Sequence, residues 1–497
     1  MLATIRTAAL VGVEACPVQI EVDVSFGLPM FTVVGLPDAS IRESRDRVRS
    51  AIRNSGFEFP AHRITVNLAP ADVRKVGAAL DLPIAVGILA AQGTIRPDAV
   101  ADTVIVGELS LDGSIQPTRG VLPVAVTARR EGARRLVLPA PNAGEAAVVL
   151  PSGVIPVDSL ADAVEALRGD RKPAPIPPTP AAPPFEYPDL ADVAGQLLAR
   201  RAIEIAAAGG HNLLMTGPPG AGKTMMARRM AGILPPPTFD EALAATAIHS
   251  VAGLLPAGSG LLAVRPFRAP HHTVTAVALT GGGLHPRPGE VSLAHTGVLF
   301  LDEMFEFGRH ALEVLRQPLE EGVVTVTRAA RTATFPARFI LVGAANPCPC
   351  GFAGDATREC RCSPLQVARY VGQLSGPLRD RLDLGVEVPR VPPDLLGEAG
   401  GGEASAPVRR RVVAARARQR ERGGAINGML TPAETRRICA LDRAGVRLLS
   451  AAADRLGLTA RGFDRVRRVA RTIADLGESD RIEADHLSEA IQFRLPR

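Results

Sequence analysis

A glycine-rich segment near the middle of the chain constrains the fold most. The apolar run Leu213–Met215 leads into the pattern Gly217-x-x-x-x-Gly222-Lys223-Thr224, and a stretch with helical spacing follows. A strand, a tight loop and a helix in this order are typical of a phosphate-binding loop in an α/β fold, because loop N–H groups and the helix N-terminus attract an anion. The segment therefore predicts a nucleotide site.

Each residue type in this loop has a chemical reason to be there. Gly220 and Gly222 let successive N–H groups converge on phosphates, Lys223 can reach the β- and γ-phosphate oxygens, and the Thr224 hydroxyl can ligate Mg²⁺. Lysine is rare in this sequence, with only three residues against 54 arginines. The candidate ATP-binding residues are Gly217, Pro218, Pro219, Gly220, Ala221, Gly222, Lys223 and Thr224.

Two further apolar runs end in polar residues that complete such a site. GVLFLDE ends in Asp302 and Glu303, and RFILVGAAN ends in Asn346. Asp302 would hold Mg²⁺ with its water shell, Glu303 would act as the base that polarises the attacking water, and Asn346 could orient that water. Together the three runs predict a doubly wound α/β ATPase core with ATP and Mg²⁺ as its ligands.

Two breaks divide the sequence into units. A Pro-rich stretch, Lys172–Pro188, cannot form a helix or a central strand, and a Gly-rich polar stretch, Gly397–Pro407, precedes a mostly helical part. We therefore expect an N-terminal α/β unit, a linker, an α/β core and a helical C-terminal unit, over residues 1–170, 171–188, 189–396 and 397–497.

Composition excludes a membrane protein. Of the 497 residues, 46% are hydrophobic and 22% charged. The longest uncharged apolar stretch, Leu82–Ala91, has half of the ~20 residues that a membrane span requires. The N-terminus lacks the pattern of a secretory signal, so a cytoplasmic location is expected.

Positive charge is concentrated at the C-terminus. Residues 401–497 contain 20 Arg and 12 Asp or Glu. Such a surplus is typical of a protein that binds a polyanion such as nucleic acid, and equally of solvated helix faces. With no Trp and two Tyr, recognition of single strands would depend on Arg and backbone amides.

Five motifs in a fixed order carry a family resemblance: GPPGAGKT, RPFRAPHHT, GVLFLDEM, AANPCPCG and SGPLRDRLDL. They resemble the magnesium-chelatase-like AAA+ ATPases, and the full-length layout resembles the ComM branch. The resemblance implies a ring, expected to be a homohexamer, with ATP sites between subunits. It also implies that Asn346 is a sensor residue, that Arg381 is an arginine finger for the neighbouring subunit, with Arg379 as the other candidate, and that Arg461 is a second sensor near the N-cap Thr459.

The N-terminal unit resembles the proteolytic domain of Lon. By this resemblance the nucleophile and lysine positions of the protease hold Ala79 and Leu122, so both halves of its catalytic dyad are missing. Lys75 is the only lysine of this unit, and we expect it to be a surface or loop charge. A non-proteolytic scaffold for ring assembly or DNA contact is expected.

Four of the six cysteines form two close pairs directly after Asn346: Cys348, Cys350, Cys360 and Cys362. Four thiolates suit tetrahedral Zn²⁺, although C-x-C is tighter than usual spacing; reduced structural cysteines or a redox-sensitive pair remain alternatives. The isolated Cys16 and Cys439 are expected to be buried.

Two segments bearing arginines are candidate pore elements. Residues 265–290, which include Arg268, His271 and His272, read as a long insertion or an irregular surface loop, with a weak metal site at the two histidines as a further alternative. Residues 323–339 alternate like a hairpin with Arg328 and Arg331 near its tip. In a pore, Arg268, Arg328 and Arg331 would contact phosphate rather than bases.

These features predict a cytoplasmic, ring-forming, ATP-driven DNA motor that migrates branched recombination intermediates during DNA uptake or repair, with single-stranded or branched DNA as its partner. The alternative is a chelatase-like ATPase that remodels a protein partner for metal insertion. An ATP-dependent protease is excluded by Ala79 and Leu122.

Overall fold

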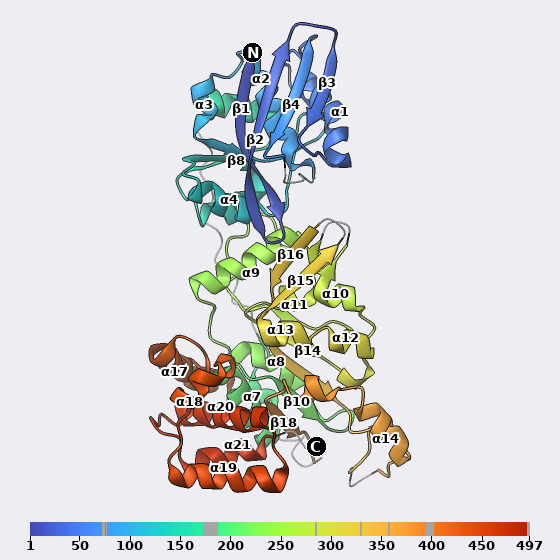
Figure 1. The fold of residues 1–497 in the computed structure, drawn as a ribbon, viewed down its shortest axis with the longest axis vertical. Helices are drawn as coiled ribbons and strands as arrows, with labels where there is room; N and C mark the ends of the chain where they lie inside the picture. Colours follow the sequence, from blue (N-terminus) through green and yellow to red (C-terminus); the bar gives the residue numbers. More distant parts are fainter. Residues whose placement is uncertain are drawn as a thin grey trace.

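The protein forms three units that follow one another along its long axis (Figure 1). The computed structural model describes residues 1–71, 75, 77–171, 187–283, 286–328, 331–355, 358–392 and 402–494. In the described part of the chain, no helix combines the length and apolar character needed to cross a bilayer.

The N-terminal unit is a seven-stranded sheet, in the order β3-β4-β2-β1-β5-β8-β9, with helices packed against it. Its strands are β1 (Leu2–Val11), β2 (Glu14–Ser25), β3 (Met30–Val34), β4 (Arg63–Ala69), β5 (Thr103–Ile105), β8 (Arg135–Pro139) and β9 (Val154–Val157), beside a small hairpin of β6 (Glu108–Leu109) and β7 (Ile115–Gln116). Its helices are α1 (Ala39–Asn54), α2 (Asp81–Ala91), α3 (Pro97–Ala101), α4 (Val121–Arg130), α5 (Ala143–Ala147) and α6 (Leu160–Arg168).

Helix α2, which contains the apolar stretch Leu82–Ala91, is the central helix of this unit. Every residue of α2 is buried, and the helix packs against β1, β2 and α1. Gly87 permits this, because a Cβ there would lie 2.6 Å from Cγ2 of Val22. A stretch too short for a membrane is thus apolar all round because it is enclosed on every side.

Lys75 is buried, so the expectation of a surface or loop charge was wrong. Its Nζ donates hydrogen bonds to the carbonyl oxygens of Leu68, at 2.9 Å, and Pro70. Carbonyl oxygens compensate part of the cost of taking an ammonium group out of water. Leu122 is buried in an apolar cluster and Ala79 packs against the same cluster, so both positions carry apolar packing.

The core contains a five-stranded sheet in the order β11-β14-β17-β10-β18, in which all neighbours are parallel. Its strands are β11 (Phe267–Arg268), β14 (Val298–Leu301), β17 (Ile340–Ala345), β10 (Leu213–Thr216) and β18 (Leu384–Glu387). The two-stranded elements are β12 (Gly281–Gly282) with β13 (Arg287–Pro288), and β15 (Val323–Arg328) with β16 (Arg331–Pro336). The helices are α7 (Leu197–Gly209), α8 (Lys223–Ile233), α9 (Phe239–Ala252), α10 (Ala276–Thr280), α11 (Glu290–Leu293), α12 (Arg309–Glu313), α13 (Arg316–Glu321), α14 (Pro364–Val371) and α15 (Gly376–Arg379).

Residues 265–290 are more ordered than the irregular surface loop that the sequence left open as an alternative. They contribute the edge strand β11 and the helix α10, which an irregular loop would not. Arg265 is buried and donates to the carbonyl oxygens of Pro235 and Thr296 and to the Glu241 carboxylate. The sequence concealed this because β11 is only two residues long.

The C-terminal unit is helical, as expected, and consists of α17 (Ser405–Gly423), α18 (Pro432–Ile438), α19 (Arg443–Leu456), α20 (Ala460–Leu476) and α21 (Ala484–Gln492). α17 and α20 pack against α7 of the core, and the core and this unit share one hydrophobic cluster. Thr459 caps α20, as expected, because its side chain accepts a hydrogen bond from the N–H of Gly462.

Several arginines of this unit are structural, which neither interpretation of its charge anticipated. Arg416 is buried and donates twice to the Ala207 carbonyl oxygen of α7, at 2.9 and 2.7 Å. Arg422 and Arg471 both pair with the buried Asp475. Part of the excess of arginine in this unit therefore forms hydrogen bonds and ion pairs within the protein.

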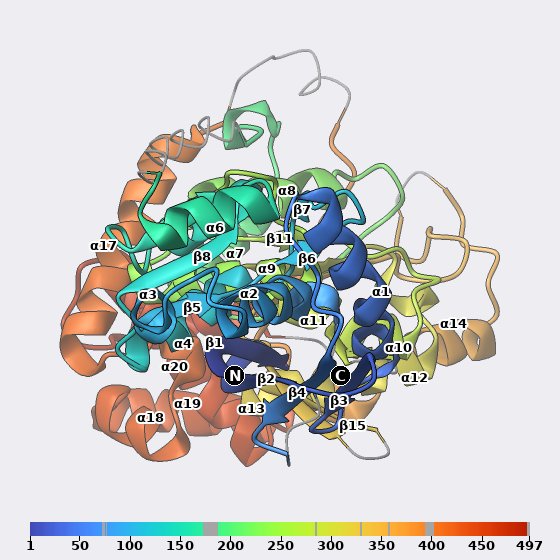
Figure 2. The ribbon, with the colours of Figure 1, turned by 90° about the horizontal axis from the view of Figure 1, so that it is seen from above.

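The N-terminal unit lies on the core through α9 and the β15–β16 hairpin (Figures 1 and 2). α4 packs against α9, and Ser250 Oγ of α9 donates to the buried Glu145 carboxylate at 2.5 Å. Val13, in the turn between β1 and β2, packs against the apolar cluster that includes residues of β15 and β16. The two units thus meet through packed side chains. Residues 172–186 of the Pro-rich segment between them in the sequence lie outside the described part.

Candidate functional site

The parallel sheet brings the predicted ATP-site residues together. β14, β17 and β10 are adjacent, and their carboxyl ends lead into Asp302, Asn346 and the loop that begins at Gly217. Ligands of open parallel sheets bind at this edge, where loops that are distant in sequence converge. Thr224 Oγ1 donates to Asp302 Oδ2 at 2.7 Å, so the two predicted Mg²⁺ ligands are in contact.

Lys223 is held by oxygen atoms at the centre of the site. Its Nζ donates to the carbonyl oxygens of Gly217 (2.6 Å) and Pro218 (2.9 Å) and to Oδ1 of Asn346 (3.1 Å). Burial lowers the pKa of Lys223, while Asp302 and Glu303 act in the opposite direction. The loop lysine and the predicted sensor amide therefore contact each other directly.

The loop fits a phosphate chain and Mg²⁺. Gly220 and Gly222 have φ values of +77° and +92°, which few side chains tolerate. A Cβ at either glycine would meet no atom within 4 Å, so the space beside the loop is open. Its N–H groups and Lys223 would bind ATP, and Thr224 with Asp302 would hold Mg²⁺, which supplies a charge that neutralises phosphate oxygens.

Glu303 contacts a residue to which sequence reasoning gave a different role. His272 Nδ1 lies 3.2 Å from Glu303 Oε2, and Glu303 has a left-handed backbone with φ of 50°. The sequence places His272 in an insertion or irregular loop and offers only a weak metal site as a further role. In the described residues, the one candidate metal cluster of three or more ligands contains no histidine. The signal that could have found this contact was the His271–His272 pair, which begins three residues after the end of the short strand β11.

Arg381 and Arg461 share one carboxylate. The Arg381 guanidinium donates to Glu320 on α13 and, at 2.6 Å, to the Pro377 carbonyl oxygen. Arg461 lies 4.0 Å from Glu320 and is exposed. Hydrogen bonding from Arg381 lowers the pKa of Glu320. Nothing in the sequence marked Glu320 as the residue that joins the two expected arginines.

Neither arginine has a described contact with the loop residues or with Asp302 and Glu303 of the same chain. The backbone of Arg381 is fixed instead by Asn212, whose Nδ2 donates to its carbonyl oxygen at 2.8 Å. Arg379 ends α15, and its own carbonyl oxygen accepts from Arg465. In the described contacts, only Arg381 of the two candidate fingers pairs with Glu320.

The three DNA-contact candidates lie in different surroundings. Arg268 is half-buried and forms a two-pronged pair with Glu290, at 2.7 and 2.8 Å, which raises the pKa of Arg268. Arg328 and Arg331 are opposite each other at the end of the β15–β16 hairpin, as the alternation predicted. The side chains of these two lie outside the described residues.

The four clustered cysteines converge on one point. Their sulfur atoms all lie within 4.8 Å of one another, with Cys348 Sγ to Cys350 Sγ at 3.3 Å and Cys360 Sγ 3.7 Å from each. Cys439 is buried, as expected, whereas Cys16 is half-buried because it lies on the long hairpin strand β2. The cluster can hold a metal ion.

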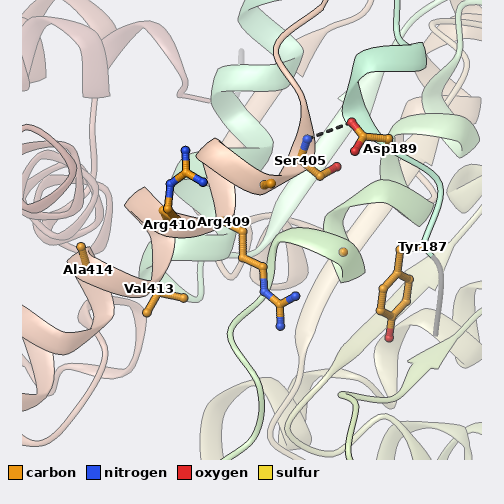
Figure 3. Close-up of a pocket in the computed structure, with 9 residues that line it drawn as sticks. Tyr187, Asp189, Ser405, Arg409, Arg410, Val413 and Ala414 are labelled. Atoms are coloured by element: carbon orange, nitrogen blue, oxygen red, sulfur yellow. Dashed lines mark hydrogen bonds between the residues drawn. The ribbon is translucent and has the colours of Figure 1, made fainter. Parts of the chain in front are cut away.

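An open pocket of about 620 Å³ lies away from these residues, between α8 and α17 (Figure 3). Tyr187 and Arg409 line it from opposite sides, and the Ser405 backbone N–H donates to Asp189 at 2.8 Å beside it. The pocket contains none of the predicted site residues. We assign the functional site to the sheet edge, where the chemistry converges.

Comparisons with known proteins show the family of the chain. Three family models match: "Magnesium chelatase, subunit ChlI" over residues 189–396, "Subunit ChlI of Mg-chelatase" over 20–142, and "Magnesium chelatase, subunit ChlI C-terminal" over 402–494. The YifB protein of Salmonella typhimurium is 44% identical over 495 residues, 99% of this chain and 97% of the relative.

The Competence protein ComM of Haemophilus influenzae is 45% identical over 501 residues, again 99% of this chain and 97% of the relative. By contrast, the magnesium-chelatase subunit ChlI of Chlorella vulgaris is 40% identical over only 70 residues, 14% of this chain and 20% of the relative. The full length is thus shared with YifB and ComM. The chain belongs to the magnesium-chelatase ChlI-like family and has the full-length layout of its YifB and ComM members.

Proposed function

We propose that this protein is a ring-forming ATPase that uses ATP and Mg²⁺ to move branched or single-stranded DNA, as in branch migration during DNA uptake or repair, in the cytoplasm. The observation that carries the ATPase part is the contact of Lys223 with Asn346 and of Thr224 with Asp302 at the edge of one parallel sheet. These pairs join the phosphate-binding loop after β10 to the ends of β17 and β14.

The site residues divide the chemistry of hydrolysis between them. Lys223 and the loop N–H groups bind the β- and γ-phosphates, and Glu303 accepts a proton from the attacking water while Asn346 orients it. A guanidinium at the γ-phosphate stabilises the charge of the transition state. Because Arg381 has no described contact with the ATP site of its own chain, we assign it to the site of a neighbouring subunit in a homohexamer.

The DNA part of the proposal is supported by the near full-length likeness to a competence protein and by the hairpin that carries Arg328 and Arg331. Arginines at a hairpin end contact phosphates without reading bases, which suits a motor that must move along any sequence. Arg268 would also contact a DNA phosphate, and to do so its guanidinium would have to leave its ion pair with Glu290.

The deciding experiment measures ATP turnover with three additions: a four-way DNA junction, single-stranded DNA, and a porphyrin with chelatase partner subunits. We expect the two DNA additions to stimulate turnover, and junction strands to exchange with ATP but not in Lys223→Ala. Stimulation only by the porphyrin mixture, with no DNA binding at low salt, would replace this proposal with partner remodelling for metal insertion.

A further inference from the structure

The 18-residue connection from Asn346 to Ser363 has no backbone ladder of its own in its described residues, so its order must come from other interactions. It joins β17 to α14 and contains no helix or strand in its described residues. All four clustered cysteines lie in it, and Cys348 is buried. Closing such a loop costs chain entropy, which a metal bound at both ends of the loop can offset.

The sulfur positions match one kind of metal site. In a tetrahedral zinc–thiolate site with bonds of about 2.3 Å, neighbouring sulfur atoms lie about 3.8 Å apart. Among Cys348, Cys350 and Cys360 the three sulfur–sulfur separations are 3.3, 3.7 and 3.7 Å. All four ligand atoms also fall within 4.8 Å of one another, as a single central ion requires.

Backbone N–H groups already point at the sulfur atoms. The N–H of Ala353 donates to Cys348 Sγ at 3.3 Å. Cys350 Sγ accepts from the N–H groups of Phe352 and Arg361, and the sulfurs of Cys360 and Cys362 also accept backbone N–H bonds. Donors of this kind stabilise thiolates and orient them toward a metal.

The cysteine cluster is packed against the nucleotide loop. Gly351, between the first two cysteines and the rest of the connection, has φ of +85°, and a Cβ there would lie 2.6 Å from Pro219 Cδ and 3.9 Å from Asn346 Cγ. Asn346 itself precedes Cys348 by two residues and accepts from Lys223. A metal that fixes this turn would therefore fix the contact between the loop and the sensor amide.

We propose that Cys348, Cys350, Cys360 and Cys362 bind one structural Zn²⁺ per chain, and that this ion positions Asn346 and the phosphate-binding loop for nucleotide. Zinc binding does not depend on the proposed function. The positioning of Asn346 and the loop rests on the ATP site of the proposed function and does not depend on DNA binding.

The metal part is tested on the full-length protein purified without chelator. We expect one zinc per chain by elemental analysis, and tetrathiolate absorption bands after Co²⁺ replaces it. Cys360→Ser with Cys362→Ser should lose the metal, while Cys16→Ser, a half-buried cysteine outside the cluster, should keep it. Zinc near zero with four titratable thiols, or a disulfide in the freshly purified protein, would overturn the assignment.

The positioning part is tested by equilibrium binding of ATP without DNA. The double cysteine variant should bind ATP about tenfold more weakly, the size of one lost hydrogen bond. Gly351→Ala keeps all four thiolates, so it should retain one zinc and still bind ATP more weakly because its Cβ meets Pro219. Unchanged ATP affinity in both variants would refute positioning, even if zinc is present.

Discussion

Lys223 and Lys75 show how one residue type serves two purposes in this protein. Both amino groups donate to backbone carbonyl oxygens in buried surroundings. Lys223 in addition contacts Asn346 and lies near the carboxylates of Asp302 and Glu303. Its neighbours, rather than its burial, distinguish it as the candidate phosphate-binding lysine.

The first prediction concerns the ATP site. Lys223→Ala should lower ATP turnover by about 100-fold or more, because a preorganised cation at the phosphates is lost. Glu303→Gln should bind ATP with little change yet fail to hydrolyse it, because it removes the base and leaves Thr224 and Asp302 in place. Steady-state turnover and ATP binding measure the two effects, and normal turnover in Glu303→Gln would remove this residue from its role.

The second prediction concerns acid stability. His295 is buried, its Nδ1 accepts from the N–H of Arg338, and burial lowers its pKa to about 4 from 6.5. The unfolded chain therefore takes up a proton before the folded one does, so stability is complete above pH 6.5 and falls as the pH drops toward about 4.

The expected loss near pH 5 is about 2 kcal/mol. His295→Gln retains an acceptor but cannot titrate, so it should flatten the pH dependence of the thermal unfolding transition, while His62→Gln at an exposed site should not. An equally steep acid loss in His295→Gln would show that another group is responsible.

At the scale of elements, the longer strands of the core were predictable from the sequence pattern, whereas the two-residue strand β11 was not. β14 and β17 are buried apolar runs with polar ends, and they were predictable from the sequence. β11 has two residues and becomes a strand only because β14 lies parallel beside it. That pairing places His272 near Glu303, a contact between residues 31 positions apart in the chain.

The third prediction concerns the β15–β16 hairpin. Replacing Arg328 and Arg331 by Ala should reduce DNA stimulation of ATP turnover and lower the salt dependence of DNA binding by about two units of log–log slope, because two phosphate contacts are lost. Basal turnover should remain. Arg447→Ala on the exposed surface of α19 is the control, and an unchanged slope in the double variant would exclude the hairpin from the DNA path.

At the scale of the whole molecule, α13 and the C-terminal unit hold the two expected arginines near one another. Glu320 lies between Arg381, from the end of the core, and Arg461, from the start of α20. These positions are 80 residues apart, and only the packing of α20 and α17 on α7 brings them together.

The fourth prediction is that Arg381 acts on a neighbouring subunit. Arg381→Ala and Lys223→Ala should each be inactive, whereas mixed rings should recover part of the turnover at interfaces that pair an intact loop with an intact arginine. Mixing Arg379→Ala with Lys223→Ala is the comparison. If all Arg381 mixtures stay inactive while rings assemble, the arginine serves its own chain or Arg379 is the finger.

The sequence by itself determined the nucleotide loop, the strands that end in Asp302 and Asn346, the helical C-terminus and the cysteine pairs, because each is encoded by neighbours along the chain. Only the tertiary structure decided that Lys75 is buried and that arginines of the C-terminal helices form buried hydrogen bonds between helices. It also decided that His272 contacts Glu303 and that Glu320 contacts Arg381. Those facts depend on burial and on pairs remote in sequence, and local patterns of residues contain no information on either.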